Sequence, residues 1–183
     1  MATTTPNFGW SVPTSTDYVK DGATAIETLG DSIDSTVNAF SRGKVLSVVN
    51  TNTTAITGGV ELTICTGSAT IVPGRRYTMY GNCAYQAGGS GSGNVMLWLN
   101  QSSFNRAIAY ETTSVAANLN SHRNGTITFS AADVGVTTGS GTALTFNLKL
   151  RTANNCTLST DPDGILGANT YPQTMFIMDS GPA

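Results

Sequence analysis

The residues that could carry out catalysis are few and scattered. The only histidine, His122, lies in the polar stretch 120–125 with no nucleophile motif beside it, so we expect a loop histidine and not a member of a catalytic triad. No Gly-rich phosphate loop precedes a helical pattern. The carboxylates of the strand-rich part show no pairing typical of glycoside hydrolysis: Glu61, Glu111, Asp133, Asp161, Asp163 and Asp179. We therefore predict no catalytic residue and no cofactor.

The segment Asp161-Pro162-Asp163-Gly164 has two interpretations. Alternating carboxylates before a glycine resemble the opening of a calcium loop, and Asp161 and Asp163 would be the ligands. The later ligands of such a loop are missing, and Asp-Pro-Asp-Gly is also a favourable turn sequence. We predict a turn and no metal, with these two aspartates as the candidates if calcium is bound.

The three cysteines predict buried thiols. Cys65, Cys83 and Cys156 are odd in number, far apart and without CxxC spacing, which indicates neither a disulfide framework nor a zinc site. Each falls in a strand-like segment, where a free cysteine behaves as a small apolar residue.

The composition limits the partners that the chain can have. Only 11% of the residues are charged, the formal net charge is −2, and the nine Lys and Arg are scattered. Nucleic-acid binding requires clustered basic residues, so we predict none. No apolar run approaches the ~18 residues of a membrane span, and no secretory leader precedes the fold, so we predict neither membrane insertion nor secretion.

The first twenty residues have the pattern of an extended anchoring arm. Thr5-Pro6 and Val12-Pro13 keep the residues before each proline extended. Phe8, Trp10 and Tyr18 supply apolar surface with no local core to receive it. We predict that residues 1–20 form an anchoring arm and that these three aromatic residues bind a partner surface.

Residues 21–43 predict the chain's one helix, with Asp21 as N-cap and Gly43 as the stop. Apolar residues at steps of three and four form one stripe: Ile26, Leu29, Ile33, Val37 and Phe40. The stripe fits either a helix lying on its own domain or a self-associating stalk, and two heptads are too short to hold a coiled coil unaided. Gly30 costs about 1 kcal/mol relative to Ala, which favours a packed helix.

Residues 44–183 predict an antiparallel β-sandwich. Apolar and polar residues alternate from Val60 to Cys65 and from Leu144 to Arg151, as in half-buried strands. Turn signals bound further candidates at 45–49, 69–72, 76–86, 94–100, 104–110, 125–130 and 174–179. Eight or nine strands without a second helix indicate a jelly-roll-like, mainly β fold.

Three features of this domain predict surface roles. Pro73-Gly74 predicts a turn, and the run 88–93 predicts a flexible loop that joins two strands as a hairpin, with Gly88, Ser90 and Ser92 as contact residues. The run Val95 to Leu99, around Trp98, is apolar on both faces, so a neighbouring subunit or the helix should cover it. Aromatic rings near predicted strand ends that could stack on sugars are Tyr85, Tyr110 and Tyr171, and we expect most of them to be core or rim residues instead.

The N-terminal segment resembles that of tailed-bacteriophage structural proteins, chiefly minor tail and tail-fibre proteins. The resemblance covers about a fifth of the chain and runs through Thr5 to Trp10, Pro13 to Val19, Asp21 to Ala23, Ala25 to Ile26 and Leu29 to Asp34. The β-domain resembles small phage knob and fibre-head domains more loosely, and the closing Ile177 to Pro182 is similar to the ends of such proteins.

The resemblance implies a homotrimeric virion protein that is assembled in the host cytoplasm. In the leading hypothesis it belongs to a tail fibre or tail tip, held by its arm, with the β-domain facing outward to bind a host-surface glycan or protein. An alternative is a capsid decoration or head-fibre protein that cements the shell. A third is a carbohydrate-binding or depolymerising module.

Overall fold

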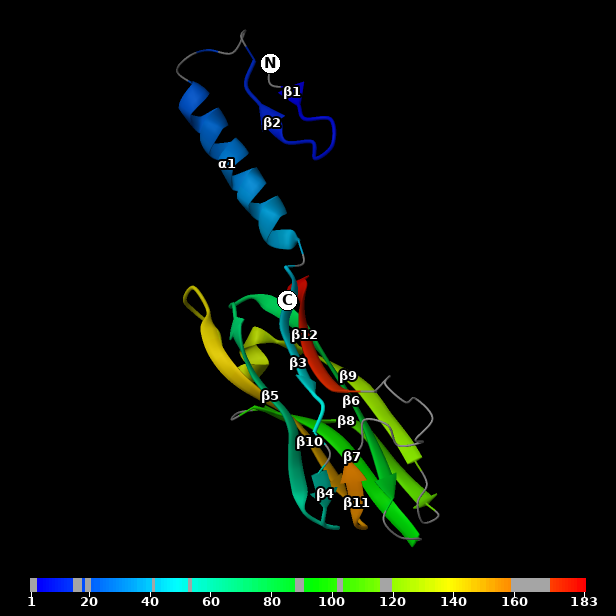
Figure 1. Ribbon diagram of the computed structural model, residues 1–183. Coiled ribbons are helices and arrows are strands. Elements are labelled where there is room, and N and C mark those ends of the chain that lie inside the picture. Colours follow the sequence, from blue (N-terminus) through cyan, green and yellow to red (C-terminus); the bar gives the residue numbers. More distant parts are fainter. Residues whose placement is uncertain are drawn as a thin grey trace. The chain divides into compact units, whose positions relative to one another are not determined.

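The computed structural model describes residues 3–14, 18, 21–40, 42–52, 54–87, 91–101, 104–115, 120–158 and 172–183. It is mainly β and divides into two compact units, Met1–Ser41 and Arg42–Gly181 (Figure 1).

The first unit holds a short hairpin and the helix. Strands β1 (Thr3–Thr4) and β2 (Ser11–Val12) pair antiparallel, and Gly9 N–H donates to the Thr5 carbonyl at 3.0 Å in the connection between them. The segment expected to be an extended arm therefore has two short extended pieces that turn back on each other.

Helix α1 spans Gly22–Ala39, within the predicted range but ending earlier than Gly43. Phe40 already has extended backbone (φ −71°, ψ 143°), so the helix ends there, and Gly43 (φ +74°) begins the next strand. Asp21 occupies the N-cap position as predicted, but its side chain makes no capping hydrogen bond, because its backbone stays helical (φ −93°, ψ −7°).

The second unit is a sandwich of two antiparallel sheets. The first sheet has the order β5-β10-β7-β8, from strands Glu61–Ile71, Thr142–Thr152, Gly91–Gln101 and Phe104–Val115. The second has the order β3-β12-β6-β11-β4, with β9 also beside β6, from strands Gly43–Asn50, Gln173–Pro182, Arg75–Ala87, Cys156–Leu158, Thr54–Ile56 and Asn120–Ser130. The chain passes repeatedly between the sheets, as a jelly roll does, which confirms the predicted fold class.

Three local predictions about the strands were wrong. The strands before and after residues 88–93 do not form a hairpin, because β6 and β7 belong to different sheets. The predicted strands at 60–65 and 69–72 are one strand, β5, which stays paired with β10 past Gly67. Ser92 lies within β7 opposite Ser114, not in a loop, while Gly88 and Ser90 lie outside the described residues.

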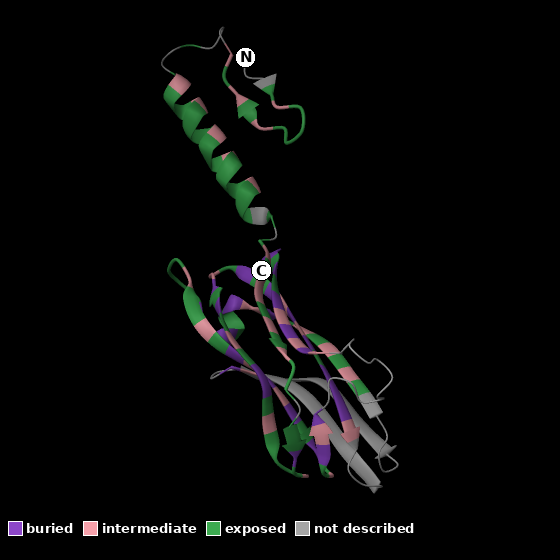
Figure 2. Ribbon diagram, in the orientation of Figure 1, coloured by how far each residue is buried: buried purple, intermediate pink, exposed green. Residues whose placement is uncertain are grey.

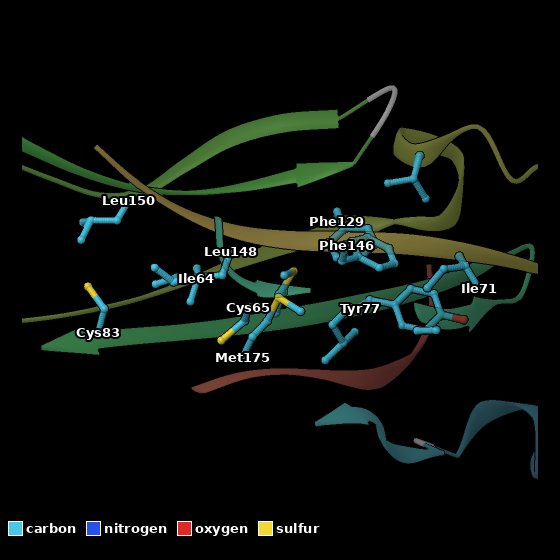
Figure 3. Close-up of a cluster of buried hydrophobic side chains, with 14 of the residues drawn as sticks. Ile64, Cys65, Ile71, Tyr77, Cys83, Phe129, Phe146, Leu148, Leu150 and Met175 are labelled. Atoms are coloured by element: carbon cyan, nitrogen blue, oxygen red, sulfur yellow. The ribbon is translucent and has the colours of Figure 1, made fainter. Parts of the chain in front are cut away.

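Alternate residues of the strands fill the space between the sheets. In β10, Phe146, Leu148 and Leu150 are buried, as the alternation predicted. Phe146 contacts Phe129 of β9 with ring centroids 5.7 Å apart (Figure 3). The sheets approach so closely at Gly67 that a Cβ atom there would lie 2.6 Å from Cγ2 of Val48. Glycine at position 67 is therefore a packing requirement.

A buried ion pair joins the beginning of β6 to the end of β12. Arg75 Nε and Nη2 donate to the two carboxylate oxygens of Asp179 at 2.5 and 2.8 Å, and both side chains are 1% exposed. The predicted Pro73-Gly74 turn (Gly74 φ +70°) aims Arg75 into this site. The Gly74 carbonyl in this turn also accepts a hydrogen bond from the Ala183 N–H at 2.8 Å, which holds Ala183 against the turn.

Breaking this pair should destabilise the second unit strongly. Asp179→Asn leaves a buried guanidinium without its counter-charge, so we expect a loss of about 3–5 kcal/mol in the free energy of unfolding, measured by urea denaturation. The control is Lys149→Met, which removes a 3.5 Å contact to the half-exposed Glu61 and should cost less than about 1 kcal/mol. Equal losses in the two variants would contradict a structural role for the buried pair.

Candidate functional site

The chemically versatile side chains do not converge. His122 is exposed on β9, opposite Ala84 of β6, so the expected loop position was wrong. Asp133 closes a capping box with Ser130 at a 3-10 turn, Asp179 is in the ion pair, and Glu61 contacts Lys149. Within the described residues no group of three His, Cys, Asp or Glu could hold a metal. Asp161 and Asp163 lie outside those residues, and the side chain of Glu111 is not described.

The three cysteines are buried and free, as predicted. Burial raises the pKa of the Cys65 thiol to about 11 and that of Cys83 to about 12. It also raises the pKa of Cys156, although a hydrogen bond with Thr152 opposes the shift. A thiol with a raised pKa stays protonated at neutral pH and is a poor nucleophile.

The residues proposed for sugar stacking and for a covered strand are only partly described. Tyr85 is 1% exposed, so its ring belongs to the core, as expected for most of these tyrosines, and it offers no face to a sugar. Tyr171 lies outside the described residues, and the side chains of Tyr110 and of Val95 to Leu99, Trp98 included, are not described. The backbone of β7 is central in its sheet, between β10 and β8.

The apolar stripe of α1 is exposed within its own unit. Ile26, Ile33, Val37 and Phe40 are 65%, 37%, 59% and 54% exposed, whereas Leu29 is half-buried. No described residue of α1 is buried (Figure 2). Four large apolar side chains on one helix face are more than an isolated helix in water would keep exposed without a partner.

The hairpin packs on a different, more polar side of α1. The Trp10 indole N–H donates to the hydroxyl of Thr36 at 3.0 Å, and the half-buried helix residues recur at steps of three and four: Gly22, Ala25, Leu29, Ser32 and Thr36. Thr36 itself donates to the Ser32 carbonyl at 2.8 Å, as short hydroxyl side chains do within helices. The hairpin therefore leaves Ile26, Ile33 and Val37 of the apolar stripe exposed.

The arm aromatics extend this apolar surface. Phe8 stacks on Trp10 with ring centroids 4.9 Å apart and meets Phe40 edge-on at 6.3 Å. Phe8 is 55% exposed, and Tyr18 is 75% exposed. Phe8 thus contacts Phe40, the last residue of the predicted stripe, and Trp10 stacks on Phe8. The sequence pattern did not predict this association.

Gly30 lies on the same helix, and within the described part of the first unit no neighbour packs closely against it. A Cβ atom placed on it would find nothing within 4 Å, so the close packing expected from its helix cost is not made by the hairpin.

The second unit presents one further distinct surface, which we name the outer sheet face. It consists of the outward side chains of four neighbouring strands of the second sheet: Thr174, Phe176, Met178 and Ser180 of β12, Arg76, Thr78, Tyr80 and Asn82 of β6, His122, Asn124, Thr126 and Thr128 of β9, and Lys44, Ser47 and Val49 of β3. Tyr80 and Phe176 stack at its centre with centroids 4.4 Å apart. An open groove of about 360 Å³ lies there, lined in part by Asn82, Asn124 and Thr126.

No helix among the described residues is sufficiently long and apolar to cross a membrane.

Comparison with known proteins gives structural likeness alone. No protein-family model matches the chain, and no curated protein sequence does either. A chain of the infectious bursal disease virus T13 particle is similar over 78% of this chain and 36% of its own length, with 10% identity and a TM-score of 0.45. Eiger TNF from S. frugiperda is similar over 78% of this chain and 96% of its own, with 8% identity and a TM-score of 0.43. Murine APRIL at pH 5.0 is similar over 75% and 99%, with 11% identity and a TM-score of 0.41.

The burial of the thiols makes a direct prediction. In the native protein we expect no fast reaction of any cysteine with a disulfide reagent at pH 8, because Cys65 and Cys83, with pKa values of about 11 and 12, hold almost no thiolate there. In denaturant all three cysteines of the chain should titrate. A native thiol that reacts at the denatured rate would place that cysteine in a reactive site.

Proposed function

We propose that this chain is a non-enzymatic virion structural protein that assembles through α1 into a homotrimer and attaches to the particle by its N-terminal arm. The observation that carries the proposal is the apolar stripe of α1, in which Ile26, Ile33, Val37 and Phe40 stay exposed although the hairpin packs on the same helix and its Phe8 contacts Phe40. The resemblance of residues 5–34 to tailed-phage structural proteins supplies the context.

The stripe favours self-association over packing on the chain's own domain. Ile26, Ile33 and Phe40 are a heptad apart, the spacing of a seam between helices. Gly30 lies near the stripe with open space above it, so neighbouring helices could approach its backbone closely. Three copies follow from the resemblance to trimeric fibre proteins.

The arm supplies the attachment surface in this proposal. Phe8 and Tyr18 expose more than half of their surface, which is costly for aromatic rings in water and favours burial against a second protein. The jelly roll then faces outward at a tail fibre or tail tip, where three copies bind a host-surface glycan or protein by avidity. In the alternative, the same trimer is a capsid decoration or head-fibre protein.

The helix role predicts the effect of a single charge. Ile33→Asp would bury an unpaired carboxylate in a helix seam, so the dissociation constant of the oligomer should rise about 100-fold or more, measured by light scattering over a concentration series. The matched control is Ser35→Asp, an exposed position away from the stripe, which should leave the mass unchanged. Equal behaviour of the two variants would remove α1 as the seam.

The arm role predicts a loss of attachment without a loss of folding. The double variant Phe8→Ala, Tyr18→Ala removes the two most exposed aromatic rings of the arm. Its incorporation into particles should fall about tenfold or more, while the mass of the oligomer stays unchanged. The control is Asn7→Ala, at an exposed position of the arm. Incorporation is measured by mass spectrometry of purified virions. Unchanged incorporation would show that the arm is not the anchor.

Imaging the same virions by cryo-EM decides between the two locations. Density that is present with the natural arm and lost with the double variant should lie at the tail tip or on fibres. If it lies on the capsid lattice, the chain is a decoration protein and receptor binding no longer applies.

A further inference from the structure

We propose that the outer sheet face of β3, β12, β6 and β9 is the surface through which the jelly rolls of neighbouring copies pack on one another. The inference rests on the proposed self-association through α1 and adds a second, separate interface. Its occupant is another copy of this chain.

The outer sheet face has the chemistry of an interface core. Its centre is the stacked pair Tyr80 and Phe176, and it continues into Met178, which is 36% exposed, and Val49, which is 58% exposed. Aromatic residues and methionine are enriched in the centres of protein interfaces, and charged residues are depleted there.

The centre of the outer sheet face carries no formal charge, whereas two exposed charged residues lie at its rim: Lys44, opposite Met178, and Arg76, two residues before Thr78. The polar groups of the centre are hydroxyls and amides, and several already bond to one another: the Thr78 hydroxyl to Ser180 at 2.9 Å, and the Thr174 N–H to the amide oxygen of Asn82 at 2.7 Å. The other sheet carries charges on its outside, including Glu61 and Lys149. Burying neutral groups that are already hydrogen-bonded to one another costs less desolvation free energy than burying an unpaired charge.

The short connection between α1 and β3 favours a second copy of the chain, and not an unrelated protein, as the partner that covers the outer sheet face. Gly43, the first residue of β3, follows Phe40, the last residue of the apolar stripe, by three residues, a span of at most about 10 Å. Helices that associate would therefore hold their β3 strands near one another, and β3 carries Ser47 and Val49 of this face. Tethered surfaces meet at an effective concentration of order millimolar, at which a weak interface suffices.

A glycan is the other occupant that the groove admits. Sugar rings bind by lying flat on an exposed aromatic face, but Tyr80 and Phe176 use one face each on the other, with an angle of 14° between the ring planes. The apolar surface also extends past the groove to Val49 and Met178, where a small neutral sugar would leave it uncovered.

The test places one charge on each sheet of the full-length protein. Phe176→Asp should raise the dissociation constant of the oligomer about 30-fold or more, because it buries a carboxylate between copies. Thr66→Asp, at an exposed position of β5 on the other sheet, should leave it unchanged. Circular dichroism and the unfolding midpoint check that each variant folds, and Thr126→Lys on β9, an exposed site of the outer sheet face, replaces Phe176→Asp if that variant does not.

The rate at which hydrogen peroxide oxidises Met178 tests whether the outer sheet face is covered in the wild-type protein. In the wild-type oligomer Met178 should oxidise about tenfold more slowly than in a dissociated Phe176→Asp sample, since a neighbouring copy would cover its thioether. An oligomer of unchanged affinity in Phe176→Asp or Thr126→Lys, or rapid oxidation of Met178 in the wild-type oligomer, overturns the inference.

Two further results separate this inference from the proposed function. Loss of the oligomer in Ile33→Asp with no effect of Phe176→Asp would retain the α1 trimer and reject the sheet interface. A wild-type chain that is monomeric at all concentrations would reject the trimer itself. Binding of the wild-type oligomer to an array of neutral oligosaccharides that Phe176→Asp abolishes, with its mass unchanged, would assign the groove to a glycan and overturn the copy interface.

Discussion

The ion pair between Arg75 and Asp179 is the constraint on which the arrangement of the second sheet depends. Its atoms are buried, and the two residues are 104 positions apart in the chain. Asp179 also stands opposite Gly43 in the β12–β3 ladder and accepts from Gly181 N–H at 2.9 Å. The carboxylate of Asp179 therefore ties the start of β6 to the end of β12, and its backbone stands beside the start of β3. Because a buried charge without its partner is costly, registers that separate these two groups are excluded.

Fixing this register decides which side chains of β12 face outward. Met175 and Ile177 enter the core, and their neighbours Phe176 and Met178 are then obliged to face the other way, because successive strand residues point to opposite faces. A shift of one residue would exchange the two sets and place the charge of Asp179 on the surface. The core and the apolar outer face are thus two consequences of one register.

Periodicity in the sequence was enough to predict those elements that depend mainly on neighbouring residues in the chain. The two-residue alternation predicted β10, the three- and four-residue steps predicted that residues within 21–43 form helix α1, and Pro73-Gly74 predicted a turn. Pairing between distant segments was not predictable in this way. The glycines and serines of 88–93 suit a hairpin and a crossover equally, so nothing local placed β6 and β7 in different sheets. The contact of Trp10 with Thr36 likewise depends on how the arm folds back.

The low charge of the chain connects the two surfaces that we assign to assembly. Hydroxyl and amide groups keep the surface of a strand domain hydrated when the domain is alone. They lose that water at a small cost in free energy when a similar surface covers them. Such groups therefore suit a face that is exposed before assembly and buried after it. Association through a two-heptad stripe alone would be weak, and so would association through the sheet face alone. Each contact buries too little apolar surface to offset the entropy lost on association. Joined by three residues, the first contact supplies the proximity that the second requires, and neither has to be strong.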